Sequence, residues 1–265
     1  LALTDRNGLY GIPHFLETAR AHGLAPIIGA EAVKNGQRAV LLVRDEDGYA
    51  NLCRLLSGLH TRSDFSLHKE LAGYRRGLTV VTDDPAVLKP LAHQSGQHLF
   101  VELSPGHRMH QALALSRELN LPPVATTRAV LLDPDDLELQ WVIRAIALNT
   151  KLSRLRPEDS ACAHDRLCAA QSLKDLFPHC PEALANTLRI ANDCQADRDF
   201  SATVFPAYRG LSASKAGEEL ERRARAGALW RYGHIDGRVA ARLGLELEMI
   251  NEKGFAHYFL VVEEI

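Results

Sequence analysis

Several features that would point to a function are missing from this chain of 265 residues. No apolar run approaches the roughly 20 residues that a membrane-spanning helix requires, so we expect no membrane association. The net charge is only −2, from 31 basic and 33 acidic residues, which argues against a protein that binds nucleic acid through overall positive charge. No glycine-rich phosphate loop and no Ser–His–Asp nucleophile motif stand out. The composition is ordinary for a globular protein, with 46% hydrophobic and 24% charged residues.

The cysteines form no C-x-x-C pair, although there are five of them: Cys53, Cys162, Cys168, Cys180 and Cys194. An odd and dispersed set fits reduced thiols, so we expect a cytoplasmic protein without disulfides. The segment "CAHDRLC", with Cys162, His164 and Cys168, precedes His179 and Cys180 and contains potential zinc ligands. Its spacing matches none of the usual zinc patterns. We therefore interpret these side chains as buried or half-buried helix residues.

The first half of the chain alternates short apolar runs with segments of helical spacing. Strands are predicted at 1–4, 25–32, 38–44, 77–84, 98–103 and 122–127, and helices at 11–22, 48–59, 85–96 and 110–120. This alternation predicts an α/β fold, either a parallel sheet covered by helices or a closed α/β barrel. Because chemistry in such folds lies at the carboxyl ends of the strands, the segments 4–5, 29–31, 102–107 and 126–127 are expected to face a site.

From Asp133 onward the pattern becomes mainly helical. Helices are predicted at 133–148, 172–177, 180–194, 212–233 and 237–255. The first has an acidic first turn, and Pro181 occupies a favourable first helical position in the third. The stretch 196–212 lacks periodicity and carries proline and glycine, so it is interpreted as a linker. Both ends of the chain fall inside predicted elements, and we expect it to be a piece of a longer protein.

At this point the residues resemble a known family. The segments "LALTDRNGLYGIPHFLETARAHGLAPIIGAE", "GYANLCRLLS", "LPPVATTRAVLLDPDD" and "SLKDLFPHCPEALANTLRIANDC" resemble the PHP (polymerase and histidinol phosphatase) domain of bacterial C-family DNA polymerases. "EELERRARAGALWRYG" and "RLGLELEMINEKGFAHYFLVVEEI" resemble the stretch that enters their palm domain. That family comprises the alpha subunit of DNA polymerase III and its error-prone relatives. The resemblance implies a distorted PHP-type (β/α)7 barrel at 1–195 that lacks its first strand, a linker at 196–212, and the start of the palm at 213–265.

The resemblance also implies where a PHP metal site would lie. Family members with an intact site hold metals with His, Asp, Glu and Cys side chains, and a His-x-His pair would precede Leu1. Asp5 and Glu31 match surviving ligand positions, and His107 matches one loosely. Asp5 could instead be a turn residue, since "TDRNG" is rich in turn formers, and Glu31 could instead pair with a nearby arginine.

Other ligand positions of the family are occupied here by Arg6, Arg38, Arg128 and Val130. A guanidinium offers no lone pair and stays protonated, so it cannot ligate a cation and would repel one. It can, however, take the place of the ion by pairing with the remaining carboxylates. We therefore expect no metal site in this chain and treat Asp5, Glu31 and His107 as vestigial candidates.

Four arginines of the predicted helix 212–233 are candidates for contact with the DNA backbone: Arg222, Arg223, Arg225 and Arg231. Phosphate contact requires only positioned cations. The alternative is a solvated helix face on which Glu218, Glu219 and Glu221, one turn earlier, form local ion pairs. The sequence leaves both open.

The resemblance implies a fragment of a bacterial DNA polymerase III alpha-type subunit that serves template-directed DNA synthesis in replication or error-prone repair. Its PHP module is expected to be inactive and structural, and the palm carboxylates of the parent polymerase, with their Mg²⁺ ions, would lie beyond Ile265. No cofactor is expected in the fragment. Its partners would be DNA and other replication or repair proteins. The alternatives are a metal-dependent PHP-class phosphoesterase, a proofreading 3′–5′ exonuclease, or an interaction protein derived from the same fold.

Overall fold

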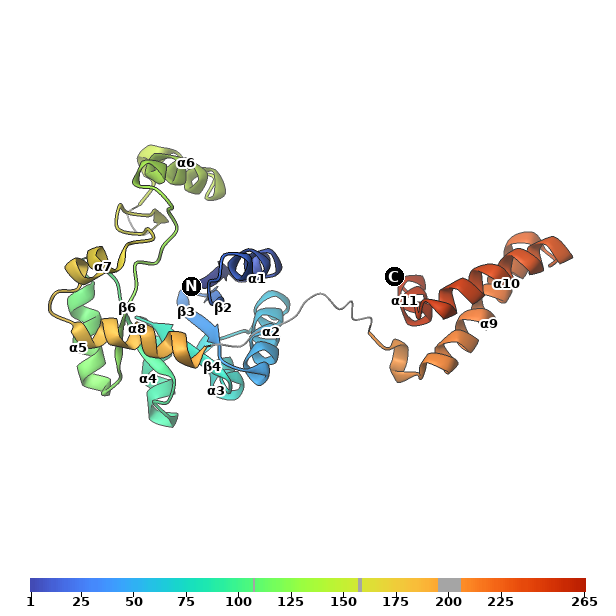
Figure 1. Ribbon diagram of the computed structural model, residues 1–265, viewed down its shortest axis with the longest axis horizontal. Helices are drawn as coiled ribbons and strands as arrows, with labels where there is room; N and C mark the ends of the chain where they lie inside the picture. Colours follow the sequence, from blue (N-terminus) through green and yellow to red (C-terminus); the bar gives the residue numbers. More distant parts are fainter. Residues whose placement is uncertain (107, 157–158, 195–205) are drawn as a thin grey trace. The chain divides into compact units, whose positions relative to one another are not determined.

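The chain divides into two compact units, Leu1–Arg198 and Asp199–Ile265 (Figure 1). The computed structural model describes residues 1–106, 108–156, 159–194 and 206–265. Most of the predicted linker at 196–212 lies outside these residues. Within them, no helix combines the length and the apolar character needed to cross a bilayer.

The first unit is built on one mixed sheet of six strands in the order β1-β2-β3-β4-β5-β6. The strands are β1 (Ala2–Arg6), β2 (Ile27–Lys34), β3 (Gln37–Val43), β4 (Leu78–Thr82), β5 (Leu99–Leu103) and β6 (Pro123–Ala125). All six predicted strands are present. Three pairings are parallel, but β3 runs antiparallel to both β2 and β4. The expectation of a parallel sheet is therefore wrong at β3.

A two-residue turn explains the reversal. Asn35 and Gly36 connect β2 to β3 and both have positive φ angles, 52° and 78°. A type I′ hairpin requires this conformation at both central residues, and Asn-Gly is its strongest sequence signal. Because β3 is antiparallel to β2 and β4, its first residues lie at the edge of the sheet where those two strands end.

Five helices pack on one face of the sheet: α1 (Ile12–Ala21), α2 (Glu46–Thr61), α3 (Leu67–Tyr74), α4 (Pro85–Gln94) and α5 (Met109–Leu119). The spacing on α2 predicts a single apolar stripe, and Leu52, Leu55, Leu56 and Leu59 are indeed all buried. Alternate residues of β2 and β3 face these helices and form the main core with them.

The opposite face is covered in part by α8 (Pro181–Asp193), which contacts β6 and begins at the predicted proline. Ile190 and Cys194 pack against Phe100 and Val124 on this face. The strands β4 and β5 are therefore buried on both sides. The other strands are less enclosed, since β1 has no buried residue and β2 and β3 are buried only in part.

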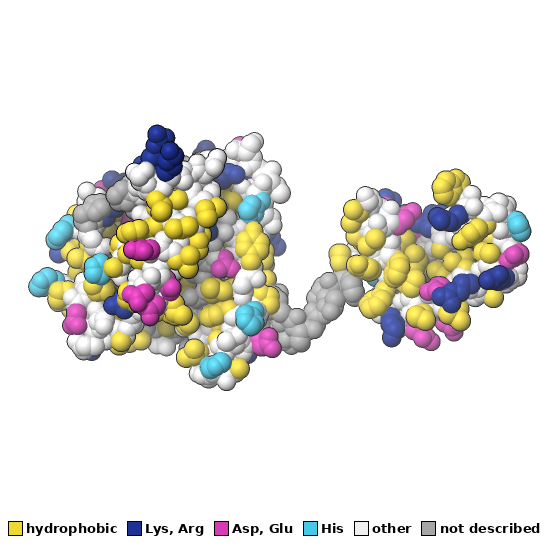
Figure 2. Space-filling model, turned by 90° about the horizontal axis from the view of Figure 1, so that it is seen from above, with side chains coloured by type: hydrophobic (Ala, Val, Ile, Leu, Met, Phe, Trp, Pro, Cys, Tyr) yellow, Lys and Arg dark blue, Asp and Glu magenta, His cyan; other side chains and the backbone are white. Residues whose placement is uncertain are grey.

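The helix α6 (Leu137–Ala147) has an unusually exposed apolar surface. It follows η1 (Pro134–Asp136) and precedes η2 (Leu152–Arg154) and α7 (Ala170–Leu176). Its exposed side chains include Leu139, Val142, Ile143 and Ile146. Figure 2, which views the molecule from the side on which α6 lies in Figure 1, shows hydrophobic side chains gathered on this face of the first unit.

The second unit consists of α9 (Ala213–Tyr232), α10 (Gly237–Glu252) and α11 (Ala256–Glu263), preceded by η4 (Tyr208–Gly210). Ser212 accepts a hydrogen bond from the backbone of Lys215 and begins α9 as a serine cap. Leu220, Leu247 and Leu260, one from each helix, are buried together.

The close approach of α2 to the turn before β4 gives a first prediction. A Cβ atom at Gly48 would lie 1.9 Å from the carbonyl oxygen of Gly77, too close for any real contact. We expect Gly48→Ala to lower the free energy of unfolding by about 1–3 kcal/mol, as overpacking does. Gly73→Ala on α3 is the matched control, because a Cβ there would meet no atom within 4 Å. Equal urea midpoints for the two variants would contradict this packing.

Candidate functional site

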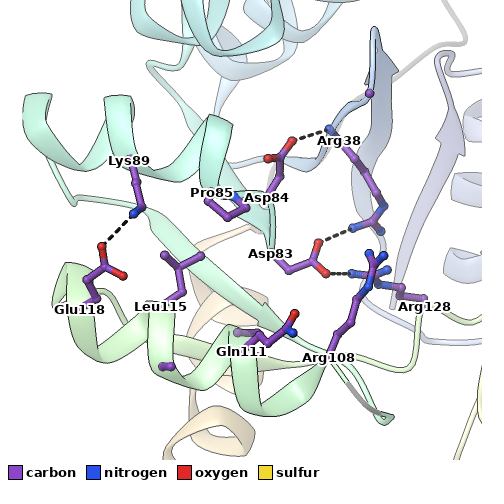
Figure 3. Close-up of a pocket in the computed structure, with 13 residues that line it drawn as sticks. Arg38, Asp83, Asp84, Pro85, Lys89, Arg108, Gln111, Leu115, Glu118 and Arg128 are labelled. Atoms are coloured by element: carbon purple, nitrogen blue, oxygen red, sulfur yellow. Dashed lines mark hydrogen bonds and ion pairs between the residues drawn. The ribbon is translucent and has the colours of Figure 1, made fainter.

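Five charged side chains converge at the edge of the sheet where β2, β4, β5 and β6 end. Glu31 lies in β2, Arg38 at the start of β3, Asp83 directly after β4, Glu102 in β5, and Arg128 after β6. The hairpin at Asn35-Gly36 delivers Arg38 to this edge. We call these five residues the carboxyl-edge cluster, and Figure 3 shows Arg38, Asp83 and Arg128 pointing toward one another.

Arg38 joins the carboxylates of neighbouring strands. Its Nε donates to Glu31 Oε1 at 2.6 Å, and its Nη1 donates to Glu102 Oε2. Asp83 Oδ1 is 4.0 Å from the same Nη1. Burial opposes the charged form of this side chain, but Glu102 and Glu31 together hold the pKa of Arg38 above its ordinary value.

Arg128 approaches the same carboxylates from the other side. Its Nη2 lies 2.8 Å from Glu102 Oε2 and 2.8 Å from Asp83 Oδ2. Burial and the nearby Arg38 act against its charge, yet Glu102 and Asp83 outweigh them and the pKa of Arg128 is raised. Its backbone is left-handed, with a φ of 49°, and its amide donates to Thr126 Oγ1. This turn aims the guanidinium back over the sheet.

Glu102 is the centre of the cluster. Its side chain is only 1% exposed and accepts from both guanidiniums. A buried carboxylate is tolerated when it is paired and hydrogen-bonded, and here each of the three carboxylates has a guanidinium partner. The cluster carries three negative and two positive charges, and it ties together residues from β2, β3, β5 and the segments after β4 and β6.

The structure separates Asp5 from Glu31. Asp5 pairs in register with Ala30 and accepts a hydrogen bond from the backbone of Gly11 at 2.8 Å, so it faces α1 on the helix-covered side of the sheet. Glu31 belongs to the opposite face, because side chains alternate along a strand. Asp5 therefore stabilises the turn into α1. Its contacts match the turn alternative, and those of Glu31 match the ion-pair alternative.

The other candidates from the family pattern are more dispersed. Arg6 is exposed and forms no ion pair with the described part of the chain. Val130 is 64% exposed, and its backbone amide donates to the carbonyl of Asp165. His107 lies outside the described residues. Of the predicted residues that the structure describes, only Glu31, Arg38 and Arg128 meet in one place.

Two members of the cluster were not singled out from the sequence as ion-pair partners. Glu102 falls in a segment that is expected only to face a site, and Asp83 falls in the predicted strand 77–84 without a role of its own. A signal for Asp83 exists, because Asp83 and Asp84 directly follow the apolar run of β4 and place a carboxylate at the strand end. Asp84, its neighbour, instead caps α4 by accepting from the amide of Ala86.

The cysteine and histidine residues considered as zinc ligands lie apart. Cys162, His164 and Cys168 are in irregular segments before α7, and Cys162 is exposed, so the expectation that they are helix residues is wrong. Cys180 is the residue that precedes α8. Within the described residues, no three His, Cys, Asp or Glu side chains are placed to hold a metal ion.

Two cavities adjoin the carboxyl-edge cluster, and Arg38 and Arg128 line both. One, of about 720 Å³, lies between α4 and α5, where Lys89 and Glu118 pair across it at 2.9 Å (Figure 3). The other, of about 470 Å³, lies against the face of the sheet that α8 covers, with Glu31 and Glu102 in its lining. The two guanidiniums thus stand between the two spaces.

On α9, three of the four arginines considered for DNA contact have local partners. Arg222 and Arg223 both bind Glu219, and Arg225 binds Glu221. Arg223 also donates to Tyr208 and pairs with Glu263 of α11. These contacts match the local ion-pair alternative. Contact of Arg222, Arg223, Arg225 and Arg231 with DNA stays a prediction.

Comparison with known proteins agrees with the family resemblance. Residues 1–104 match the PHP domain. The DNA polymerase III subunit alpha of Bacillus subtilis (strain 168) is 28% identical over 292 residues, which cover 99% of this chain and 26% of that protein. The error-prone DNA polymerase of Aromatoleum aromaticum is 30% identical over 298 residues, covering 100% of this chain and 27% of that protein. The chain is thus homologous to one region of these bacterial polymerases and spans about a quarter of their length.

The central position of Glu102 gives a second prediction. Glu102→Gln should lower the free energy of unfolding by about 3 kcal/mol, because it leaves two partly buried guanidiniums without their shared partner. Urea denaturation followed by circular dichroism measures this loss. The control is Glu118→Gln, which removes a pair whose side chains are about half exposed and should cost less than about 1 kcal/mol. A loss at Glu102 no larger than at Glu118 would show that the cluster does not hold the sheet edge.

The ion pairs of α9 give a third prediction. Hydrogen bonds from Arg222 and Arg223 lower the pKa of Glu219 to about 2 from an ordinary value of 4.5. Because the folded-state pKa lies below the unfolded one, this stabilisation is present above pH 4.5 and is lost as the pH falls toward 2. Glu219→Gln should therefore lower the melting temperature at neutral pH and reduce its fall in acid. Glu248→Gln, at an exposed position on α10, should leave the acid profile unchanged.

Proposed function

We propose that this chain is the PHP module and the start of the palm of a bacterial C-family DNA polymerase that acts in replication or error-prone repair. The observation that carries the proposal is similarity over 99–100% of the chain to polymerases of both types, of which it covers about a quarter. In this view the six-stranded sheet is the frame of a distorted PHP-type (β/α)7 barrel, and α9–α11 lead into the palm.

The PHP module is, on this proposal, structural rather than catalytic. A divalent cation at the sheet edge would need free oxygen or nitrogen ligands. Glu31, Asp83 and Glu102 are each engaged by a guanidinium instead, and no histidine of the described ranges is placed with them to hold an ion. A unit charge 4 Å away contributes about 4 kcal/mol of repulsion per unit of cation charge at an effective dielectric constant near 20. The donor set therefore does not fit a metal ion, and Arg38 and Arg128 supply the positive charge that an ion would bring.

The full-length polymerase would carry out the chemistry elsewhere. Nucleotidyl transfer uses palm carboxylates with two Mg²⁺ ions, and such residues would belong to a part of the protein outside this chain. DNA and other replication or repair proteins would be partners of that whole assembly in the cytoplasm. The exposed apolar surface of α6 supports an architectural role, because such a surface suits contact with the rest of the polymerase.

One observation favours the alternative of a metal-dependent phosphoesterase or 3′–5′ exonuclease. Three carboxylates, Glu31, Asp83 and Glu102, lie at the same edge of the sheet, although they are not placed to hold one ion together. Arg38 and Arg128, which are paired with these carboxylates, argue against this alternative.

A hydrolysis assay tests the proposal. The purified chain is incubated with Mn²⁺ or Zn²⁺ and either p-nitrophenyl phosphate or a labelled single-stranded oligonucleotide. We expect no product above that of the Glu31→Gln variant, which removes one carboxylate of the carboxyl-edge cluster. Metal-dependent turnover that Glu31→Gln abolishes would overturn the structural role. Failure of the full-length gene product to extend a primer with Mg²⁺ would overturn the polymerase assignment itself.

A further inference from the structure

The turn between α9 and α10 carries aromatic and basic side chains that lie open to solvent. The two helices form a hairpin joined by residues 233–236 (Figure 1). Trp230, Arg231 and Tyr232 belong to the last turn of α9, and Arg238 belongs to the first turn of α10. All four side chains are exposed. We call these four residues the hairpin-tip cluster.

A cap at each helix end holds the cluster in place. Gly233 ends α9 with a φ of 75°, and its amide donates to the carbonyl of Leu229 at 2.8 Å. Asp236 begins α10 by accepting a hydrogen bond from the amide of Val239 at 2.8 Å. The four side chains therefore project from the ends of two capped helices and not from a loose loop.

The aromatic side chains of the cluster are more open than their size predicts. Trp230 is 86% exposed, more than any other large apolar side chain of the described residues except Ile265 at the chain end. Tyr232 is 57% exposed, and Leu229 beside them is 53% exposed. Single exposed apolar residues are common, but three within four positions form a patch of the kind that marks a binding surface.

The cations of the cluster lack carboxylate partners. The three arginines one or two turns earlier on α9 each pair with a glutamate. Neither Arg231 nor Arg238 forms an ion pair with any residue that the structure describes. Residues 226–245 contain three arginines and one acidic residue, Asp236, so the hairpin tip is positive although the whole chain carries a net charge of −2.

Helix electrostatics accounts for one of the two cations only. A cation is favourable near the last turn of a helix and unfavourable near the first. Arg231 lies in the last turn of α9, where the dipole of that helix favours it. Arg238 lies in the first turn of α10, where its charge opposes the dipole. An anion bound at the tip would offset this cost.

We propose that the hairpin-tip cluster binds single-stranded nucleic acid. Bases stack on Trp230 and Tyr232, and phosphates pair with the two arginines. Proteins that bind single strands without sequence preference combine exposed aromatic rings with cations that follow the backbone. A duplex offers phosphates but hides the faces of its bases, so the two rings select the single strand. The site rests on the proposed function for its role in the polymerase, while its chemistry is argued from these four side chains.

The competing explanation is a protein partner. Tryptophan, tyrosine and arginine are also enriched at protein–protein interfaces. An apolar protein surface would cover the rings but would leave Arg231 and Arg238 without compensating charge. A nucleic-acid strand brings a base and a negative charge with every nucleotide, which matches two rings and two cations in one cluster. The charge of the tip therefore favours the strand.

Tryptophan fluorescence tests the site directly, because the chain has only two tryptophans. Trp141 lies on α6 in the other unit, so Trp141→Phe leaves Trp230 as the single source of tryptophan emission. The full chain with this change is titrated at low salt with a 12-nucleotide oligo-dT strand, and separately with its duplex with oligo-dA. We expect the single strand to quench the emission of Trp230 and the duplex to quench it less.

Replacing the rings identifies the stacking contacts. Anisotropy of a fluorescent oligo-dT strand gives the dissociation constant of each variant. We expect Trp230→Ala and Tyr232→Ala each to weaken binding about fivefold or more, as the loss of one stacked base does. The matched control is Tyr10→Ala, which removes a ring that is 79% exposed from the first unit and should change affinity less than twofold.

Replacing the cations identifies the phosphate contacts. Arg231→Gln and Arg238→Gln should each reduce the slope of log affinity against log salt by about 0.7, the value for one phosphate contact with a single strand. Arg6→Gln removes the same charge from an exposed position in the first unit and should leave the slope unchanged.

Each outcome decides the proposal. Quenching by the single strand, together with the losses in the tip variants, supports the site. No binding of the single strand, equal affinity for the duplex, unchanged affinity in Trp230→Ala, or equal losses in the control variants would overturn it and leave the tip as a surface for a protein partner. Primer extension by the full-length protein tests the polymerase assignment separately, so the two proposals can fail independently.

Discussion

The buried carboxylate of Glu102, shared by two guanidiniums, is the interaction on which the first unit depends. A lone ionised group at this depth would be very costly, so the charge is sustainable only with fixed partners. Arg38 and Arg128 supply them and at the same time reach Glu31 and Asp83. Strands that are distant in the chain are thereby joined at one edge. The two guanidiniums offset the mutual repulsion of the three carboxylates and hold them in fixed positions.

The hairpin at Asn35-Gly36 makes this arrangement possible. In an all-parallel sheet the start of β3 would lie at the amino edge, and Arg38 would be far from Glu102. The reversal exchanges the two ends of β3, so Arg38 joins the carboxyl edge and Arg44 joins the amino edge. One strand therefore supplies a cation to each end of the sheet. The balance of charge differs between the two edges of the sheet. Three carboxylates lie beside the guanidiniums at the carboxyl edge, and one, that of Asp193, lies near Arg44 at the amino edge.

Homology and geometry answer different questions about this chain. Similarity to one region of DNA polymerase III alpha subunits and error-prone polymerases places it in an evolutionary context, over about a quarter of their length. The chemistry of individual side chains bears on metal binding, since a guanidinium where a ligand would stand changes the sign of the local charge.

Local sequence determined much of the fold: apolar runs predicted the six strands, and the period of Leu52, Leu55, Leu56 and Leu59 predicted the buried face of α2. Family resemblance, together with residue chemistry, pointed to Glu31, Arg38 and Arg128. The reversal of β3 has a local signal in Asn35-Gly36, which the alternation of apolar runs and helical segments does not report. The tertiary structure alone decided that Asp5 faces away from Glu31 and that Asp83 and Glu102 complete the cluster. The physical reason is that the register and the neighbours of each strand depend on long-range pairing, whereas hydrophobic period reports only which residues are buried.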